Sequence, residues 1–187
     1  MKIRDVLFFS PKFRFADLDF SKKQVIIEAY RDRIDGFYLT SARALLAQDR
    51  AFVAGLITCA TIDALAVYTI GGWSVHDRFV GWLKKNIPEL NKKDNGHPPK
   101  ELAERFYQDI RNGLVHECKL MNFVQFGLEQ DDLFSFDGGA MTVNPRRLLE
   151  SVELAFERHC RSLEESGEHY DNLSKLIYEN FKQELTS

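Results

Sequence analysis

The longest apolar segment of the sequence covers residues 51–70, and it limits the possible folds more than any other feature. It is interrupted by Thr58, Thr61 and Asp63. A helix of this length that is apolar on nearly all sides belongs at the centre of a folded domain. A carboxylate inside the segment favours a buried core helix over a membrane span. We therefore expect a central helix from about residue 50 to residue 70 and no membrane partner.

Five further helices are expected, because apolar residues recur every three or four positions along the chain. Their expected ranges are 21–45, 74–86, the stretch from Pro98 and Pro99 to about Met121, 145–163 and 170–185. Ser21 and Asn144 stand where N-caps are needed, and the glycines Gly71 and Gly72 would stop the central helix. Gly36 can bend the first helix.

The helix after the paired prolines is expected to bury one continuous face. The members of that face are Leu102, Phe106, Tyr107, Ile110, Leu114, Cys118 and Met121. The face is apolar and regular, so the polar residues between its members stand out as candidates for function.

The expected fold class is all-α, a single helical bundle with a small β-hairpin before the C-terminal helices. Residues 1–20 carry several phenylalanines and predict an N-terminal arm that packs onto the bundle, and residues 21–122 form the core helices. Asp137, Gly138 and Gly139 separate two short apolar runs within 133–143, which is the pattern of a hairpin. Residues 145–187 form the C-terminal helices.

Length and cysteine content indicate a cytoplasmic protein of one domain. A chain of 187 residues buries enough surface to fold without a disulfide or a structural metal. Cys59, Cys118 and Cys160 are odd in number and widely spaced, so neither a disulfide framework nor a zinc site is expected. The first residues do not resemble a secretory signal. No metal and no cofactor are expected.

Charge is distributed unevenly along the sequence. The formal net charge of −3 excludes a globally basic nucleic-acid binder. The segment 78–100 nevertheless carries a net charge of +4 and leaves −7 for the remainder. Its basic residues are Arg78, Lys84, Lys85, Lys92, Lys93 and Lys100. Two readings stay open: a solvated loop, or a surface that follows an RNA backbone.

The stretch RNGLVH, residues 111–116, places Arg111, Asn112 and His116 on the helix after the paired prolines. At about 100° per residue, Asn112 and His116 share the outward face, whereas Arg111 lies roughly 140° from His116. A regular α-helix therefore does not aim Arg111 and His116 at one atom. Either Gly113 loosens the helix locally, or a second copy of the chain brings its own motif against the first. The second explanation is favoured, and it predicts a homodimer with a composite cleft.

These residue types suit the cleavage of RNA without a metal. Histidine can take a proton from a 2′-hydroxyl or give one to the leaving 5′-oxygen. Arginine offers a permanent positive charge and a planar fork to phosphate oxygens, and asparagine can orient either group. The expected products are a 2′,3′-cyclic phosphate and a 5′-hydroxyl end.

Asp63 is a candidate supporting residue, because a carboxylate inside an apolar helix needs a partner. Arg111, near the edge of the buried face, is one candidate partner. The alternative is that Asp63 faces water or bonds a nearby hydroxyl such as that of Thr58.

The RNGLVH stretch resembles the signature of the HEPN superfamily, the higher eukaryote and prokaryote nucleotide-binding domains. Arg111, Asn112 and His116 match the family motif one by one, and Asp63 is a counterpart of an acidic residue in an earlier core helix. The place two residues after the histidine is Cys118, where some toxin members carry tyrosine. The resemblance implies an all-helical, dimeric, metal-independent endoribonuclease with an RNA substrate. It also implies a toxin–antitoxin or phage-defence setting, with an antitoxin or other inhibitory protein as a partner.

Two other interpretations remain open. The chain can be a catalytically silent HEPN domain that binds a nucleotide, an RNA or a protein. Alternatively, Arg111 and His116 are an ordinary ion-pairing residue and an ordinary surface histidine. The silent domain is the stronger rival, because a chain of net charge −3 has no large surface for holding RNA.

Overall fold

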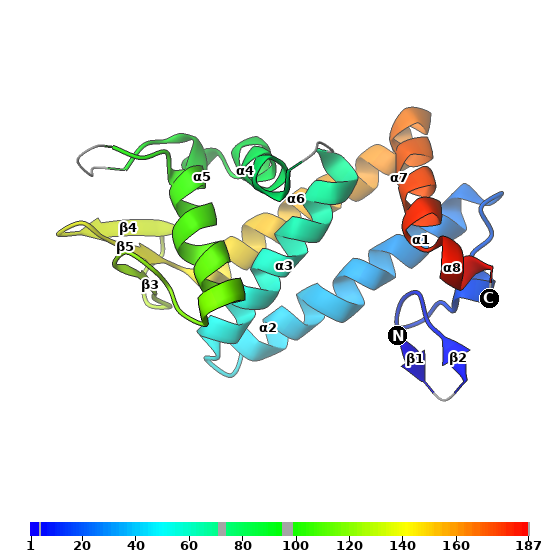
Figure 1. The fold of residues 1–187 in the computed structure, drawn as a ribbon, viewed down its shortest axis with the longest axis horizontal. Helices are drawn as coiled ribbons and strands as arrows, with labels where there is room; N and C mark the ends of the chain where they lie inside the picture. Colours follow the sequence, from blue (N-terminus) through cyan, green and yellow to red (C-terminus); the bar gives the residue numbers. More distant parts are fainter. Residues whose placement is uncertain (4, 71–73, 95–98, 187) are drawn as a thin grey trace. The chain divides into compact units, whose positions relative to one another are not determined.

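The computed structural model describes residues 1–3, 5–70, 74–94 and 99–186. It contains two compact units, one formed by Met1–Ser41 with Phe156–Ser187 and the other by Ala42–Ala155. Most of the described residues are helical, and a small sheet accompanies the helices (Figure 1). The mostly helical character and the hairpin agree with the expected all-α bundle, although the structure has more strands than the one hairpin predicted. Gly71 and Gly72, the expected helix stops, lie outside the described residues, as do His97 and Pro98.

The first unit contains the N-terminal arm and the last helices. Its elements are β1 (Lys2–Ile3), β2 (Val6–Leu7), η1 (Phe15–Asp17), α1 (Lys23–Ile34), η2 (Asp35–Leu39), α7 (Gly167–Asn180) and α8 (Lys182–Leu185). Phe9 and Phe15 are buried against Phe181, Phe9 edge-on with ring centroids 5.5 Å apart and Phe15 tilted at 5.6 Å. The arm therefore packs as expected, although it includes a short antiparallel ladder and a 3-10 turn.

Three details of this unit differ from the sequence-based expectation. Ser21 does not cap α1, because its hydroxyl donates to Asp19 and α1 begins at Lys23. The expected bend at Gly36 is a π-helical turn, η2, which continues directly into α2 (Thr40–Leu46). Helix α7 ends at Asn180, so the last helix is not continuous to Leu185.

The second unit contains the central helix and the sheet. Its elements are α3 (Ala51–Thr69), α4 (Val75–Asn86), η3 (Pro88–Asn91), α5 (Leu102–Arg105), η4 (Phe106–Glu117), β3 (Val124–Phe126), β4 (Phe134–Asp137) and β5 (Ala140–Val143). Helix α6 (Pro145–Glu165) continues from this unit into the first. Helix α3 packs against α4 and η4 (Figure 1).

Helix α3 is less enclosed than its apolar composition predicts. One face is buried, through residues such as Ala54, Cys59 and Ile62, while Phe52 and Val53 stay 41% and 45% exposed. Among the described residues, α3 is the one helix long and apolar enough to cross a membrane, and 44% of its most apolar 18-residue stretch is buried. Core helices meet the same test, so this finding does not place the helix in a bilayer.

The predicted hairpin is confirmed, and it belongs to a larger sheet than expected. Strands β4 and β5 pair antiparallel across Gly138 and Gly139, whose φ angles of 51° and 89° suit glycine. Strand β3 pairs parallel with β5 on the other side, giving the order β3-β5-β4 among the described residues. Strand β3 was not predicted from the sequence.

Helix caps explain two boundaries in the second unit. The Ser74 hydroxyl accepts from the Asp77 N–H at the start of α4, and Asn144 Oδ1 accepts from the Arg146 N–H at the start of α6. Both helices begin where the sequence predicts. The expected helix start at the paired prolines is wrong, because α5 begins at Leu102 and Pro99 lies outside it.

Candidate functional site

The motif residues lie on η4, a helix whose backbone is π-helical rather than α-helical. At its end the Cys118 N–H donates to the carbonyl of Gly113, five residues earlier. Since π-helical hydrogen bonds join residues five apart, side chains with that spacing come onto one face. Arg111 and His116 have this spacing, and Arg111 Nη1 lies 3.2 Å from His116 Nε2.

The α-helical wheel is therefore wrong for this element. Of the two explanations for the motif, local loosening of the helix around Gly113 is present within one chain, so a second copy is not required to join Arg111 to His116. The expected buried face is also shortened, since the helix ends at Glu117. Cys118 is exposed in the left-handed conformation, with φ 53°, and Met121 lies beyond the helix.

Gly113 permits the chain to fold back over the end of η4. Both Cys118 and Lys119 donate their N–H groups to its carbonyl, the latter at 3.2 Å. A Cβ at position 113 would overlap the carbonyl oxygen of Lys119 and lie 3.1 Å from Met121 Cγ. The glycine in RNGLVH therefore has a packing reason, namely the close approach of the segment that follows the helix.

Asp63 holds Arg111 from α3. Arg111 Nε and Nη2 both donate to Asp63 Oδ2 at 3.0 Å, and Nη1 donates to Asn112 Oδ1 at 3.1 Å. The guanidinium also lies 5.6 Å from the centroid of the Tyr107 ring. With a side chain only 13% exposed, Arg111 is held on several sides. Much of the fork that was expected to grip phosphate is therefore already engaged.

The predicted pairing of Asp63 with Arg111 is confirmed, and the alternative with Thr58 is not, because Thr58 donates to the carbonyl of Ala54. Burial raises the pKa of Asp63, while the charges of Arg111 and Arg78 act in the opposite direction. Burial also raises the pKa of the nearby Cys59 thiol. This part of α3 is thus a poorly hydrated setting in which a carboxylate depends on its arginine partners.

His116 is exposed, and its ring lies within hydrogen-bond distance of Arg111. Arginine has donors and no acceptor, so His116 Nε2 must accept and the proton of the neutral ring lies on Nδ1. Asn112 Nδ2 lies 3.4 Å from Gln108 Oε1, which places Asn112 between Arg111 and an exposed side chain. All three motif residues therefore meet at one polar point on η4.

The basic candidates are only partly brought to this point. Arg78 acts on the charge of Asp63 and so lies near the motif. Lys84 pairs with Glu101 at the start of α5. Lys85, Lys92, Lys93 and Lys100 are exposed or partly exposed on the surface. Within the described ranges, no hydrogen bond or ion pair joins the lysines to Arg111, Asn112 or His116.

A buried ionic cluster that was not predicted from the sequence supports the same helix. Arg105, with a side chain 9% exposed, pairs with Asp94 at 3.1 Å and with Asp109 at 3.3 Å. It also donates to the carbonyls of Asn122 and Gly139. The cluster ties α5 and η4 to the segment after the motif and to the turn of the hairpin. The spacing of Arg105 and Asp109 at i and i+4 was the available signal.

His76 supports η4 from α4. Its ring nitrogens lie 2.7 Å from Glu104 and 3.0 Å from Asp77, and these hydrogen bonds, Asp77 first, raise the pKa of His76. The ring packs edge-on against Tyr107, with centroids 4.8 Å apart. Since Tyr107 also faces Arg111, His76 belongs to the set of side chains that positions the motif.

Comparison with known proteins found no matching family model, no matching curated protein and no matching solved structure. Within the part of the chain that the structure describes, no three His, Cys, Asp or Glu side chains gather as a metal site. The chemistry of Arg111, His116 and their surroundings is therefore the basis for assigning a function.

Proposed function

We propose that this protein is a metal-independent endoribonuclease of the HEPN type. One observation carries the proposal: Arg111 Nη1 lies 3.2 Å from the ring of an exposed histidine, His116, while Asp63 anchors the guanidinium from behind. An imidazole and a fixed cation are groups that acid–base cleavage of a phosphodiester uses. The match of RNGLVH to the HEPN signature supports the same class.

The proposed reaction begins with attack of the RNA 2′-oxygen on the adjacent phosphorus, and the bond from phosphorus to the 5′-oxygen then breaks. A base takes the proton of the 2′-hydroxyl, and an acid gives a proton to the departing 5′-oxygen. The histidine that acts as the acid does so as the doubly protonated imidazolium, because the N–H of a neutral imidazole is too weak an acid to protonate the 5′-oxygen. The positive charge of Arg111 stabilises the negative charge that grows on the phosphate oxygens.

A homodimer provides the second imidazole in this proposal. Each chain has one His116, whereas the reaction uses one acid and one base. A two-fold axis near η4 would bring two motifs to one phosphate, with the second copy's histidine as the base. The resemblance further implies a cytoplasmic toxin or phage-defence component that is restrained by an antitoxin or another inhibitory protein.

Cleavage of RNA in the presence of EDTA tests the proposal. The purified protein should cut single-stranded RNA and leave 2′,3′-cyclic phosphate ends, and His116→Ala should lower the rate by roughly 10² to 10⁴. His169→Ala is the matched control, since His169 is also exposed but lies on α7. A substrate with a 2′-deoxy residue at the cut position should stay intact. Equal cleavage by His116→Ala and the parent would refute the mechanism.

The second candidate is a silent HEPN domain that binds a nucleotide, an RNA or a protein. One observation favours it: Arg111 already donates to Asp63, Asn112 and His116, which leaves little of its fork for a phosphate. This candidate predicts RNA binding without cleavage. A binding measurement beside the cleavage measurement separates the two functions.

A further inference from the structure

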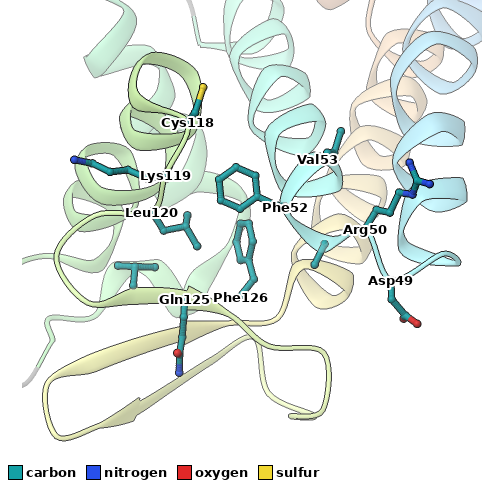
Figure 2. A pocket seen from close by; sticks show the side chains of 11 residues that line it. Asp49, Arg50, Phe52, Val53, Cys118, Lys119, Leu120, Gln125 and Phe126 are labelled. Atoms are coloured by element: carbon teal, nitrogen blue, oxygen red, sulfur yellow. The ribbon is translucent and has the colours of Figure 1, made fainter.

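A hollow of about 640 Å³ lies in the second unit, where the segment after η4 meets the start of α3 and strand β3 (Figure 2). Three short segments line it: 49–53, 118–120 and 124–126. This volume falls in the range of small-ligand pockets, which are mostly apolar with a few polar groups.

Aromatic rings form the centre of the hollow. Figure 2 shows the rings of Phe52 and Phe126 side by side, with Leu120 next to them, and the two ring centroids are 6.4 Å apart. Gly55 makes room for this arrangement, because a Cβ there would lie 2.5 Å from the Phe126 ring. Phe52 remains 41% exposed, so part of an aromatic surface faces solvent.

Arg50 also lines the hollow, and Figure 2 shows its side chain at the start of α3, directed away from the two rings. Arg50 is exposed, and its side chain makes no hydrogen bond or ion pair with the described residues. Lys119, in contrast, pairs with Glu117 at 2.6 Å. An unpartnered guanidinium and an exposed ring that line one hollow can bind an unpaired nucleotide, the first through a phosphate and the second through the base.

The hollow begins directly after the motif. Cys118 lines it and follows His116 by two residues, so their Cα atoms are at most about 7 Å apart. The bonds from Cys118 and Lys119 to the Gly113 carbonyl hold this lining segment against η4. A nucleotide whose phosphate lies at His116 could therefore place a neighbouring base in the hollow.

We infer that the hollow binds one unpaired base of the RNA substrate, stacked on Phe52, with Arg50 as the cation for the phosphate of an adjoining nucleotide. This inference rests on the proposed function, and it names single-stranded RNA as the substrate class. A protein segment would also cover apolar rings, but the unpartnered Arg50 and the adjacency to His116 favour a nucleotide.

Binding, rather than cleavage, tests the inference. The reference protein is His116→Ala, which cannot cleave the RNA. Adding Phe52→Ala to it should raise the Kd for a labelled single-stranded RNA by roughly 5- to 150-fold, the range expected for one lost base–aromatic stack. Phe52→Tyr should retain the affinity, because it keeps the ring. Leu154→Ala is the control: Leu154 is 62% exposed on α6 and lies outside the hollow, so the Kd should not change.

An abasic series identifies the nucleotide concerned. When one base beside the cut position is replaced by an abasic residue, parent and Phe52→Ala should bind with the same Kd, because the stack is then absent from both. Arg50→Gln should weaken RNA binding. It should also reduce the slope of log K against log salt concentration by about 1, because one phosphate contact is lost.

Three results would overturn the inference. The first is an unchanged Kd for Phe52→Ala while the parent binds RNA. The second is an equal loss in Leu154→Ala. The third is a Phe52→Ala protein that binds RNA with unchanged affinity but differs from its parent in oligomeric state or in binding to another protein. That result would assign the hollow to a protein partner. Each of these leaves the His116-dependent cleavage measurement untouched, so the two proposals fail separately.

Discussion

At the scale of single residues, Asp63 decides where Arg111 points. It accepts from two nitrogens of the guanidinium, and these bonds leave Nη1 directed at Asn112 and His116. The sequence alone identified all four residues, because a carboxylate in an apolar helix requires a partner. It did not reveal that Arg111 donates to the histidine, since that contact depends on backbone geometry.

Removal of Asp63 should therefore release Arg111. We expect Asp63→Ala to lower the free energy of unfolding by about 1–3 kcal/mol, because a mostly buried guanidinium loses its acceptor. Cleavage should fall as well, since Arg111 no longer holds the histidine ring. Urea denaturation measures the first effect and the RNA assay the second. Asp171→Ala, at an exposed position of α7, is the control and should change neither.

The pair can be separated from nonspecific damage by a double-mutant cycle. If Asp63 and Arg111 stabilise the fold through each other, the double variant should lose less free energy of unfolding than the sum of the losses in Asp63→Ala and Arg111→Ala. Strict additivity of the two changes would show that the ion pair contributes nothing.

At the scale of elements, the helices were predictable and the π-helix was not. Periodicity identifies α3, α4 and α6 within one or two residues, because their apolar residues repeat every three to four positions. The same reasoning assumes 3.6 residues per turn, so it misplaces Arg111 in η4. Strand β3 escaped because Val124–Phe126 is too short to show alternation, and its parallel pairing with β5 is not local.

The end of η4 should be sensitive to a single methyl group. We expect Gly113→Ala to lower the free energy of unfolding by about 1–3 kcal/mol, because the added Cβ overlaps the backbone of Lys119. The change should also move His116, which NMR signals of its imidazole would report. Gly167→Ala is a matched control, since a Cβ there meets nothing within 4 Å. A Gly113→Ala protein as stable as the control would contradict this account of the glycine.

At the scale of the whole molecule, the residues of both proposals belong to the unit Ala42–Ala155. The first unit carries the aromatic arm and α7, and none of the candidate site residues. The organisation of the chain as one domain, the dimer and the cytoplasmic setting remain predictions. Because the net charge is −3, the protein as a whole does not attract RNA electrostatically. RNA affinity will therefore depend on a few local cations.

The assembly state follows from the need for an acid and a base. We expect light scattering at micromolar concentration to report a mass near twice the 21.6 kDa of one chain. Adding His116→Ala protein to the parent should then lower cleavage more than dilution does, because a mixed dimer lacks one of the two imidazoles. A strictly monomeric protein that still cleaves RNA would remove the composite cleft and leave the single-chain site.

The left-handed residue that ends η4 has a practical consequence. Cys118 is exposed, whereas Cys59 and Cys160 are buried, and burial raises the pKa of the Cys160 thiol to about 12. A maleimide dye should therefore attach to one thiol of the native protein, two positions from the motif histidine, without any engineering. The molecule thus carries its own labelling position for following the arrival of a nucleic acid by fluorescence.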